Sequence, residues 1–266
     1  MYKGFCINKS SIELALNNYL LDSRIQTFKD VLRSLNTKQD NIASRISDIL
    51  KGDSNGVIDG EALQNACMPM PANKYDIFIS HSHTEEDEAK KLAAYLKMRY
   101  GLECFVDGFV WGSCDNDILR PLDDEWSWLN AKKESYSYKK RNYSTSLVHA
   151  MLSMALLEMI DHCECCIFVK PTTDLVVSSI ENCTTSPWIY EEITMFNKIE
   201  KRKPNRITRC MESFSVTRPK PIVRYKLDMS DMPLLKPDQL QKNIYLNDRN
   251  SAYTIAYRWL DDIYEM

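Results

Sequence analysis

From Lys74 onward the sequence alternates short apolar segments with amphipathic ones, and this alternation constrains the fold more than any other feature. The first apolar run, from Tyr75 to Ser80, is typical of a strand buried on both faces of a parallel sheet, and it stops abruptly at His81 and Ser82. Strands that alternate with helices in this way imply right-handed crossovers. We therefore expect an α/β fold with an open parallel sheet.

The remaining elements are expected in a regular order. Thr84 is expected to cap a helix that Gly101 ends. After it we predict a strand at Cys104–Val106, a helix from about Thr145 to Met159, a strand at Cys165–Val169, a helix from Ser186 to about Lys201, a strand at Ile222–Leu227 and a closing amphipathic helix at Ala252–Tyr264.

Polar residues follow the first two predicted strands. Ser80, His81 and Ser82 end the first, and Asp107 ends the second. Ligands of open parallel sheets bind in a crevice at the carboxyl ends of the strands. We expect these residues to line one cleft.

Residues 1–70 precede the alternation and show helical periodicity instead. Apolar stripes at helical spacing run through Ile12–Leu21, Ile25–Leu35 and Ile42–Leu50, and Pro69 and Pro71 mark a boundary. The sequence thus predicts a helical N-terminal extension that packs on the main domain or drives self-association. The turn-rich segment that begins at Asp53 starts like a calcium loop, but its ligand spacing is wrong, and a turn between helices is expected.

Composition excludes several classes of protein. The 34 basic and 37 acidic residues nearly balance, so no overall charge favours nucleic acid or an anionic membrane. The longest nearly uncharged stretch, Leu147–Ile160, is too short to span a bilayer. Only seven glycines are present, without a dinucleotide fingerprint or phosphate loop, and neither a serine elbow nor a histidine triad is evident. Hydride transfer, ATP hydrolysis and acyl transfer are therefore unsupported, and no cofactor is expected.

The nine cysteines, without a secretory signal segment, indicate reduced thiols in a cytoplasmic protein. The cluster around Cys163, Cys165 and Cys166 resembles a set of metal ligands, but no second Cys/His pair lies at a suitable spacing. The cluster also runs into an apolar strand. We expect small core side chains there and no metal.

Glu192 is the strongest candidate for catalysis. Ser186 and Pro187 mark the start of a helix, and Trp188 and Glu192, four residues apart, share one of its faces. A carboxylate beside an indole at the border of an apolar stripe is less solvated than one on an open surface, and it suits a cationic or oxocarbenium-like centre. The alternative is that Glu191 and Glu192 only complement the helix dipole.

Several of these segments together resemble the TIR (Toll/interleukin-1 receptor) domain. Its first strand is matched by Tyr75-Asp76-Ile77-Phe78-Ile79-Ser80-His81-Ser82, its second by Gly101–Asp107, its third by Cys163–Lys170, and its third helix by Ser186-Pro187-Trp188 with Glu192. The resemblance covers residues 74–228 and is greatest to bacterial stand-alone TIR proteins of antiphage defence, of the Thoeris type. It implies a flavodoxin-like sheet. Beyond it, residues 229–266 are expected to form a C-terminal segment whose amphipathic helix packs on the domain.

In enzymatic members of this family, the glutamate after the tryptophan is essential for cleaving the nicotinamide–ribose bond of NAD⁺. The resemblance assigns that role to Glu192, with NAD⁺ as the substrate and ADP-ribose or a cyclic isomer as the product. It also implies self-association and a downstream effector that senses the product. Residues expected to bind the substrate are Ser80, His81, Ser82, Asp107, Phe109, Trp111 and Trp188.

The chain departs from the family in a long insertion at about 108–143. Its second half, Trp126–Tyr143, interleaves five basic residues with five aromatic ones and one acid. Such a segment could bind a nucleotide or nucleic acid, or it could be a solvated insertion or a contact between protomers. We favour the solvated insertion or protomer contact, and expect no nucleic-acid partner.

Two rival functions remain open on the sequence. A non-catalytic TIR module that assembles with other TIR domains would keep a similar framework. A base-exchange glycosyl enzyme of related sheet architecture would use the same glutamate on a free nucleoside, and substrate profiling separates it from an NAD⁺ consumer.

Overall fold

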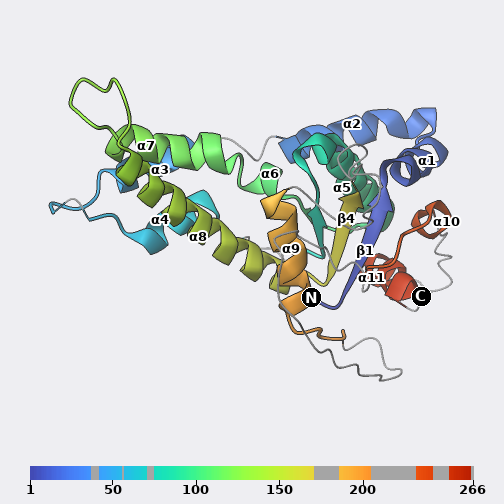
Figure 1. The fold of residues 1–266 in the computed structure, drawn as a ribbon. Helices are drawn as coiled ribbons and strands as arrows, with labels where there is room; N and C mark the ends of the chain where they lie inside the picture. Colours follow the sequence, from blue (N-terminus) through green and yellow to red (C-terminus); the bar gives the residue numbers. More distant parts are fainter. Residues whose placement is uncertain are drawn as a thin grey trace, which may run out of the picture.

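The computed structural model describes residues 1–36, 42–55, 57–70, 75–170, 186–204, 232–241 and 252–264, and their fold is α/β. Four parallel strands form one sheet in the order β1-β4-β2-β3 (Figure 1). The strands are β1 (Lys3–Asn8), β2 (Ile77–Ser80), β3 (Cys104–Phe105) and β4 (Cys165–Lys170). The prediction of a parallel α/β sheet is confirmed.

Both faces of the sheet are buried. Side chains alternate between the faces, so that in β2 Phe78 joins one apolar core while Ile77 and Ile79 join the other. In β4, Cys166 and Phe168 join the same core as Phe78, and the other buried side chains of the strand join the core on the opposite face. Two cores on one sheet require helices on both sides.

Helices supply these two covers. One face packs against α1 (Lys9–Tyr19), α2 (Asp22–Asn36), α5 (Glu86–Tyr100) and α11 (Ala252–Tyr264), with the short α10 (Pro237–Leu240) beside α1. The other face packs against α8 (Tyr138–His162) and α9 (Pro187–Lys198), which Figure 1 shows side by side.

A helical lobe extends from the α8 side of the sheet, at the left of Figure 1. It combines α3 (Ile42–Leu50) and α4 (Gly60–Cys67) with the π-helical turn η3 (Cys114–Leu119), α7 (Arg120–Trp126) and the first half of α8. The indole of Trp126 donates a hydrogen bond of 2.7 Å to the carbonyl oxygen of Leu50 and so ties α7 to α3. The predicted insertion is therefore folded, largely into helices.

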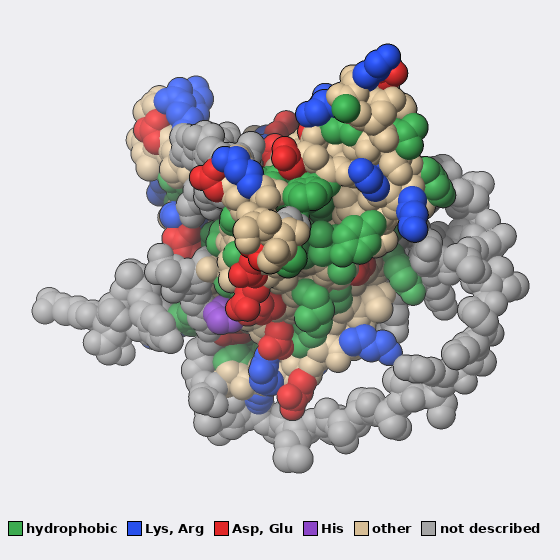
Figure 2. All heavy atoms as spheres, turned by 90° about the vertical axis from the view of Figure 1, so that its left-hand side faces the viewer, with side chains coloured by type: hydrophobic (Ala, Val, Ile, Leu, Met, Phe, Trp, Pro, Cys, Tyr) green, Lys and Arg blue, Asp and Glu red, His purple; other side chains and the backbone are tan. Residues whose placement is uncertain are grey.

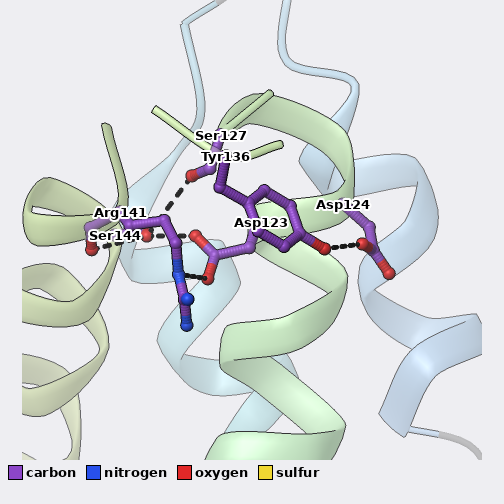
Figure 3. A network of polar contacts seen from close by, with 6 residues as sticks. All are labelled: Asp123, Asp124, Ser127, Tyr136, Arg141 and Ser144. Carbon is purple, nitrogen blue, oxygen red and sulfur yellow. Dashed lines mark hydrogen bonds and ion pairs between the residues drawn. The ribbon is translucent and has the colours of Figure 1, made fainter. Parts of the chain in front are cut away.

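A buried carboxylate joins α7 to α8. Asp123 is 2% exposed, and it accepts hydrogen bonds from Arg141 Nε at 3.0 Å and from the Ser144 hydroxyl (Figure 3). The neighbouring Asp124 accepts a hydrogen bond from the phenol of Tyr136, in the loop between the helices. Much of the basic and aromatic character of this segment thus serves its own packing, as in the stacking of Trp128 on Tyr136 at 4.1 Å.

The prediction that residues 1–70 form only a helical extension is wrong at its start. Residues 3–8 are β1, which pairs with β4 over its whole length, from Lys3 opposite Cys165 to Asn8 opposite Lys170. A short, fully buried strand has no alternating pattern, so periodicity does not distinguish it from other apolar runs. The remaining helices of this region also divide, since α1 and α2 cover the sheet whereas α3 and α4 belong to the lobe.

Other boundaries differ in smaller ways. The helix expected at Thr145–Met159 runs from Tyr138 to His162, and α5 begins at Glu86 rather than at a Thr84 cap. Thr84 instead lies in a 3₁₀ turn, η2 (His83–Glu85), where its hydroxyl donates to Glu85. Gly101 ends α5 in a left-handed conformation with φ of 71°, as predicted.

At the C-terminal side, the predicted strand 222–227 lies outside the described residues. The described segment nearest to it places Leu234 in a parallel bridge with Cys6, on β1. The closing helix has the predicted bounds, and Trp259 stacks on Tyr100 of α5 at 4.9 Å.

Candidate active site

A cleft of about 540 Å³ opens at the carboxyl end of β2. Its polar wall comes from the turns after β2 and β3 and from the start of α9. Its apolar wall comes from the end of α4, from η3 and from α8. The lining residues are Met68, His81, Ser82, His83, Glu86, Asp107, Gly108, Trp111, Gly112, Ser113, Cys114, Asp115, Asn116, Ile118, Leu152, Leu156, Ser186, Trp188 and Glu192.

Glu192 lies at the base of this cleft, in the second turn of α9. The helix begins as predicted, with Ser186 as the N-cap whose hydroxyl accepts a hydrogen bond from the Ile189 amide at 3.4 Å, and with Pro187 at the first position. Ile189, Ile193 and Phe196 anchor α9 in the core. This packing directs the neighbouring Glu192 toward the sheet, where its residue is 6% exposed.

The hydroxyl of Ser80, the last residue of β2, donates a hydrogen bond to Glu192 Oε2. The two residues are 112 positions apart in the chain, and Ser80 is 1% exposed. The strand end and the helix start that the sequence singled out are therefore in direct contact.

The electrostatics of Glu192 follow from its burial. Burial raises the pKa of this carboxyl well above its usual range, the nearby charge of Asp107 raises it further, and the hydrogen bond from Ser80 lowers it. A carboxyl in such an environment gains from any ligand that brings a positive charge next to it, because the cation favours the ionised form.

His81 and Asp107 form a second polar pair in the cleft. His81 Nδ1 lies 3.7 Å from Asp107 Oδ1, and the histidine side chain is 7% exposed against 37% for the aspartate. Both residues were predicted from their positions after the first two strands. With Glu192 and Ser80, they form the polar part of the site.

Ser82 and Trp111 line the cleft but have structural partners. The Ser82 hydroxyl donates to the buried Glu85, within the 3₁₀ turn. Trp111 is 2% exposed, packs edge-on against Phe105 at 4.7 Å, and donates its indole hydrogen to the carbonyl oxygen of Pro69 at 3.3 Å. Trp111 is thus mainly a core residue that also forms part of the cleft wall, rather than a free stacking platform.

Trp188 is half-buried at the cleft and packs edge-on against His149 of α8, with ring centroids 4.8 Å apart. Phe109 belongs to the short helix α6 (Asp107–Val110), and its side chain lies outside the described part of the structure.

Sequence reasoning missed several residues of the cleft. Glu86 lies in the helix expected after Thr84, and Leu152 and Leu156 lie in the helix expected at Thr145–Met159, but none of the three was singled out as a site residue. Met68 was assigned to an accessory region with no site. No local pattern identifies Met68, Leu152 and Leu156 as site residues, because only the packing of α4 and α8 brings them to the strand ends.

The cysteines behave as core side chains, as predicted. Those in the described residues are free thiols, and Cys163, Cys165 and Cys166 are buried. Burial raises the pKa of the Cys165 and Cys166 thiols well above the usual range, which disfavours the thiolate. Across the described ranges, no group of three or more His, Cys, Asp or Glu residues is arranged to hold a metal ion.

No family model, curated protein or solved structure matches the chain. The resemblance to TIR domains therefore depends on the motifs quoted above. The geometry of the cleft is independent of that resemblance.

Proposed function

We propose that the protein is a TIR-type NAD⁺ nucleosidase that cleaves the bond between nicotinamide and ribose with Glu192 as the essential carboxylate. The observation that carries the proposal is the buried Glu192 carboxyl, hydrogen-bonded by Ser80 in a cleft at the carboxyl end of the sheet. The strand order β3-β2-β4 also agrees with the 2-1-3 core of flavodoxin-like sheets, which is the architecture that TIR domains share.

The charges of the cleft suit the nicotinamide end of this substrate. Four carboxylates line it, those of Glu86, Asp107, Asp115 and Glu192, and the nicotinamide ring of NAD⁺ carries a positive charge. As the glycosidic bond breaks, its electron pair leaves with neutral nicotinamide, and the positive charge moves to the ribose. A carboxylate held in a poorly hydrated site stabilises that oxocarbenium-like centre more strongly than water does.

The remaining groups would position the substrate. In this proposal, Ser80 holds one oxygen of Glu192, while His81 and Ser82 are within the cleft to bind ribose or phosphate. Trp188 and the apolar wall formed by Leu152 and Leu156 would contact a ring. Attack by water gives ADP-ribose and releases one proton, whereas attack by another group of the same nucleotide gives a cyclic isomer.

The biological setting follows the same resemblance. We propose a cytoplasmic protein of antiphage defence whose nucleotide product is sensed by a separate effector. Non-catalytic assembly with other TIR domains is the alternative function.

The test is chromatographic detection of nicotinamide release from NAD⁺ by the wild type and by Glu192→Gln, at high protein concentration. We expect release by the wild type and its loss in the variant, with thermal unfolding showing that both are folded. Equal release by both proteins would exclude Glu192 as the essential group. If neither releases nicotinamide, also with infected-cell extract added, the non-catalytic alternative is favoured.

A further inference from the structure

The outer face of α8 carries a row of apolar side chains at heptad spacing. The row consists of Tyr143, Leu147, Ala150, Met154 and Leu157, in alternating steps of four and three residues. Tyr143 is 75% exposed, Met154 59% and Leu157 37%. Figure 2 shows hydrophobic side chains among charged ones on the side of the molecule where the lobe lies.

Apart from Leu147, which is half-buried and packs against the core, this row is separate from the face by which α8 belongs to the fold. Val148, Leu152, Ala155, Leu156 and Met159 are buried on the opposite side of the helix, where two of them line the cleft. A helix with an apolar stripe on each of two opposite faces packs in two directions. One direction is occupied by the protein's own core.

Charges at the two ends of the row define how a second helix would lie against it. Lys140 and Glu158 are 18 residues apart, which is about five helical turns, so they lie on the same flank of the row. Both are exposed. Lys140 donates one hydrogen bond, to the carbonyl oxygen of Trp128 at 3.1 Å, and an ammonium group has three donors.

The arrangement is self-complementary in one orientation only. If two copies of α8 packed in parallel, the two-fold axis would run along the helices and place the two charged flanks on opposite sides of the pair, so Lys140 of one copy would not meet Glu158 of the other. In an antiparallel pair related by a two-fold axis, the same flank of both helices lies on one side of the pair with its ends reversed. Lys140 of each copy then meets Glu158 of the other. The axis then passes close to Ala150, whose small side chain allows the two helices to approach.

We propose that the outer face of α8 is an antiparallel dimer interface for a second copy of this chain. The apolar row supplies the buried area, and the two symmetric Lys140–Glu158 pairs set the orientation. This inference does not depend on the proposed NAD⁺ cleavage.

A membrane surface is the other apolar environment to consider. By length and composition, α8 is the one helix in the described ranges that could cross a bilayer. Its opposite face is buried in the protein, and the acid Glu158 at the end of the exposed row suits a protein partner better than anionic lipid. The second copy is therefore the occupant we favour.

The experiment is sedimentation of the full chain over a wide range of concentration, with variants of the row and of its flanking charges. We expect a wild-type dimer, and dissociation constants raised roughly tenfold or more by Met154→Glu and by Glu158→Lys. The double variant Lys140→Glu, Glu158→Lys should restore the dimer, because it exchanges the charges without changing the pairing. Leu14→Glu, at a 47% exposed position on α1, is the matched control and should leave the dimer unchanged.

Thermal unfolding of every variant separates lost association from lost folding. A wild type that stays monomeric at all concentrations would overturn the proposal, and co-sedimentation of that monomer with vesicles of phosphatidylcholine and phosphatidylserine would assign the row to a membrane. A dimer that survives Met154→Glu, or a folded double variant no better associated than Glu158→Lys, would also overturn it.

Discussion

Glu192 differs chemically from its neighbour Glu191 because of where α9 places it. Glu192 is 6% exposed and hydrogen-bonded by Ser80, whereas Glu191 is only partly buried. Two adjacent acids at one helix start therefore have different environments, and only Glu192 lies in the cleft lining. Glu192 is therefore not an acid that only complements the helix dipole.

Substitution of the two neighbours of Glu192, Asp107 and Ser80, should shift the pH dependence of catalysis in opposite directions. The proposed reaction needs the ionised carboxylate, so kcat/KM should fall as the pH drops through the Glu192 pKa. Because the charge of Asp107 raises this pKa and the Ser80 hydrogen bond lowers it, Asp107→Asn should move the acid limb to lower pH and Ser80→Ala should move it to higher pH. The position of the limb in a pH profile of nicotinamide release measures this, independently of the maximal rate.

If the acid limb shifted in the same direction in both variants, a group other than Glu192 would control this part of the pH profile. His83→Gln is the control, because His83 lines the cleft and is absent from the groups that shift the Glu192 pKa.

At the scale of elements, α9 lies close to β1 because residue 4 of that strand is a glycine and has no side chain. A Cβ added at Gly4 would lie 2.5 Å from Cζ of Phe196, which is buried in α9 one turn after Glu192. The approach of α9 to the sheet thus depends on a glycine in the strand that the sequence did not reveal.

We expect Gly4→Ala to lower the free energy of unfolding by about 1–3 kcal/mol, because the aromatic ring must move out of a packed core. Combining it with Phe196→Leu should cost less than the sum of the single changes, since the smaller side chain leaves room for the methyl group. Urea unfolding of the three variants measures this. Additive effects would mean that the strand and helix adjust independently.

The lobe depends on the buried Asp123 in a similar way. Asp123→Ala should destabilise the protein by about 1–3 kcal/mol, because the 4% exposed Ser144 loses its carboxylate acceptor and Arg141 loses its partner. Asp124→Ala, one residue further along α7, removes only an exposed contact with Tyr136 and should cost less than about 1 kcal/mol. Chemical denaturation of both variants tests the difference, and equal losses would contradict it.

At the scale of the whole molecule, the first residues of the described chain complete a sheet whose other strands begin some seventy residues later. β1 lies beside β4, in the position next to the third strand of the alternating region, and the bridge between Cys6 and Leu234 ties it to the C-terminal side. The N-terminal region is therefore part of the main domain and not an appendage to it.

Deleting residues 1–8 should abolish cooperative folding rather than release an active core. The deletion removes every pair of the β1–β4 ladder and leaves the core positions of Phe5 and Ile7 empty. Solubility after expression and cooperativity of thermal unfolding measure the effect. A soluble truncated chain with the wild-type melting temperature would show that β1 is dispensable.

Local patterns in the sequence predicted those parts of the protein whose physics is local. The apolar run before Ser80 forms β2, Gly101 ends α5, and Ser186 with Pro187 begins α9, because caps, turns and periodicity act over a few neighbouring residues. The same patterns placed Trp188 and Glu192 on one helical face. Both the type of fold and the residue at the base of the cleft could therefore be inferred without coordinates.

The tertiary structure alone decided which distant residues meet. The hydrogen bond from Ser80 to Glu192, the pairing of β1 with β4, and the contributions of Met68 and Leu152 to the cleft join segments far apart in the chain. Such contacts arise because each element buries its apolar face against whichever partner fits, and that choice has no local signature. For this protein, the sequence by itself determined the chemical groups, and the packing of helices on both faces of the sheet determined their environment.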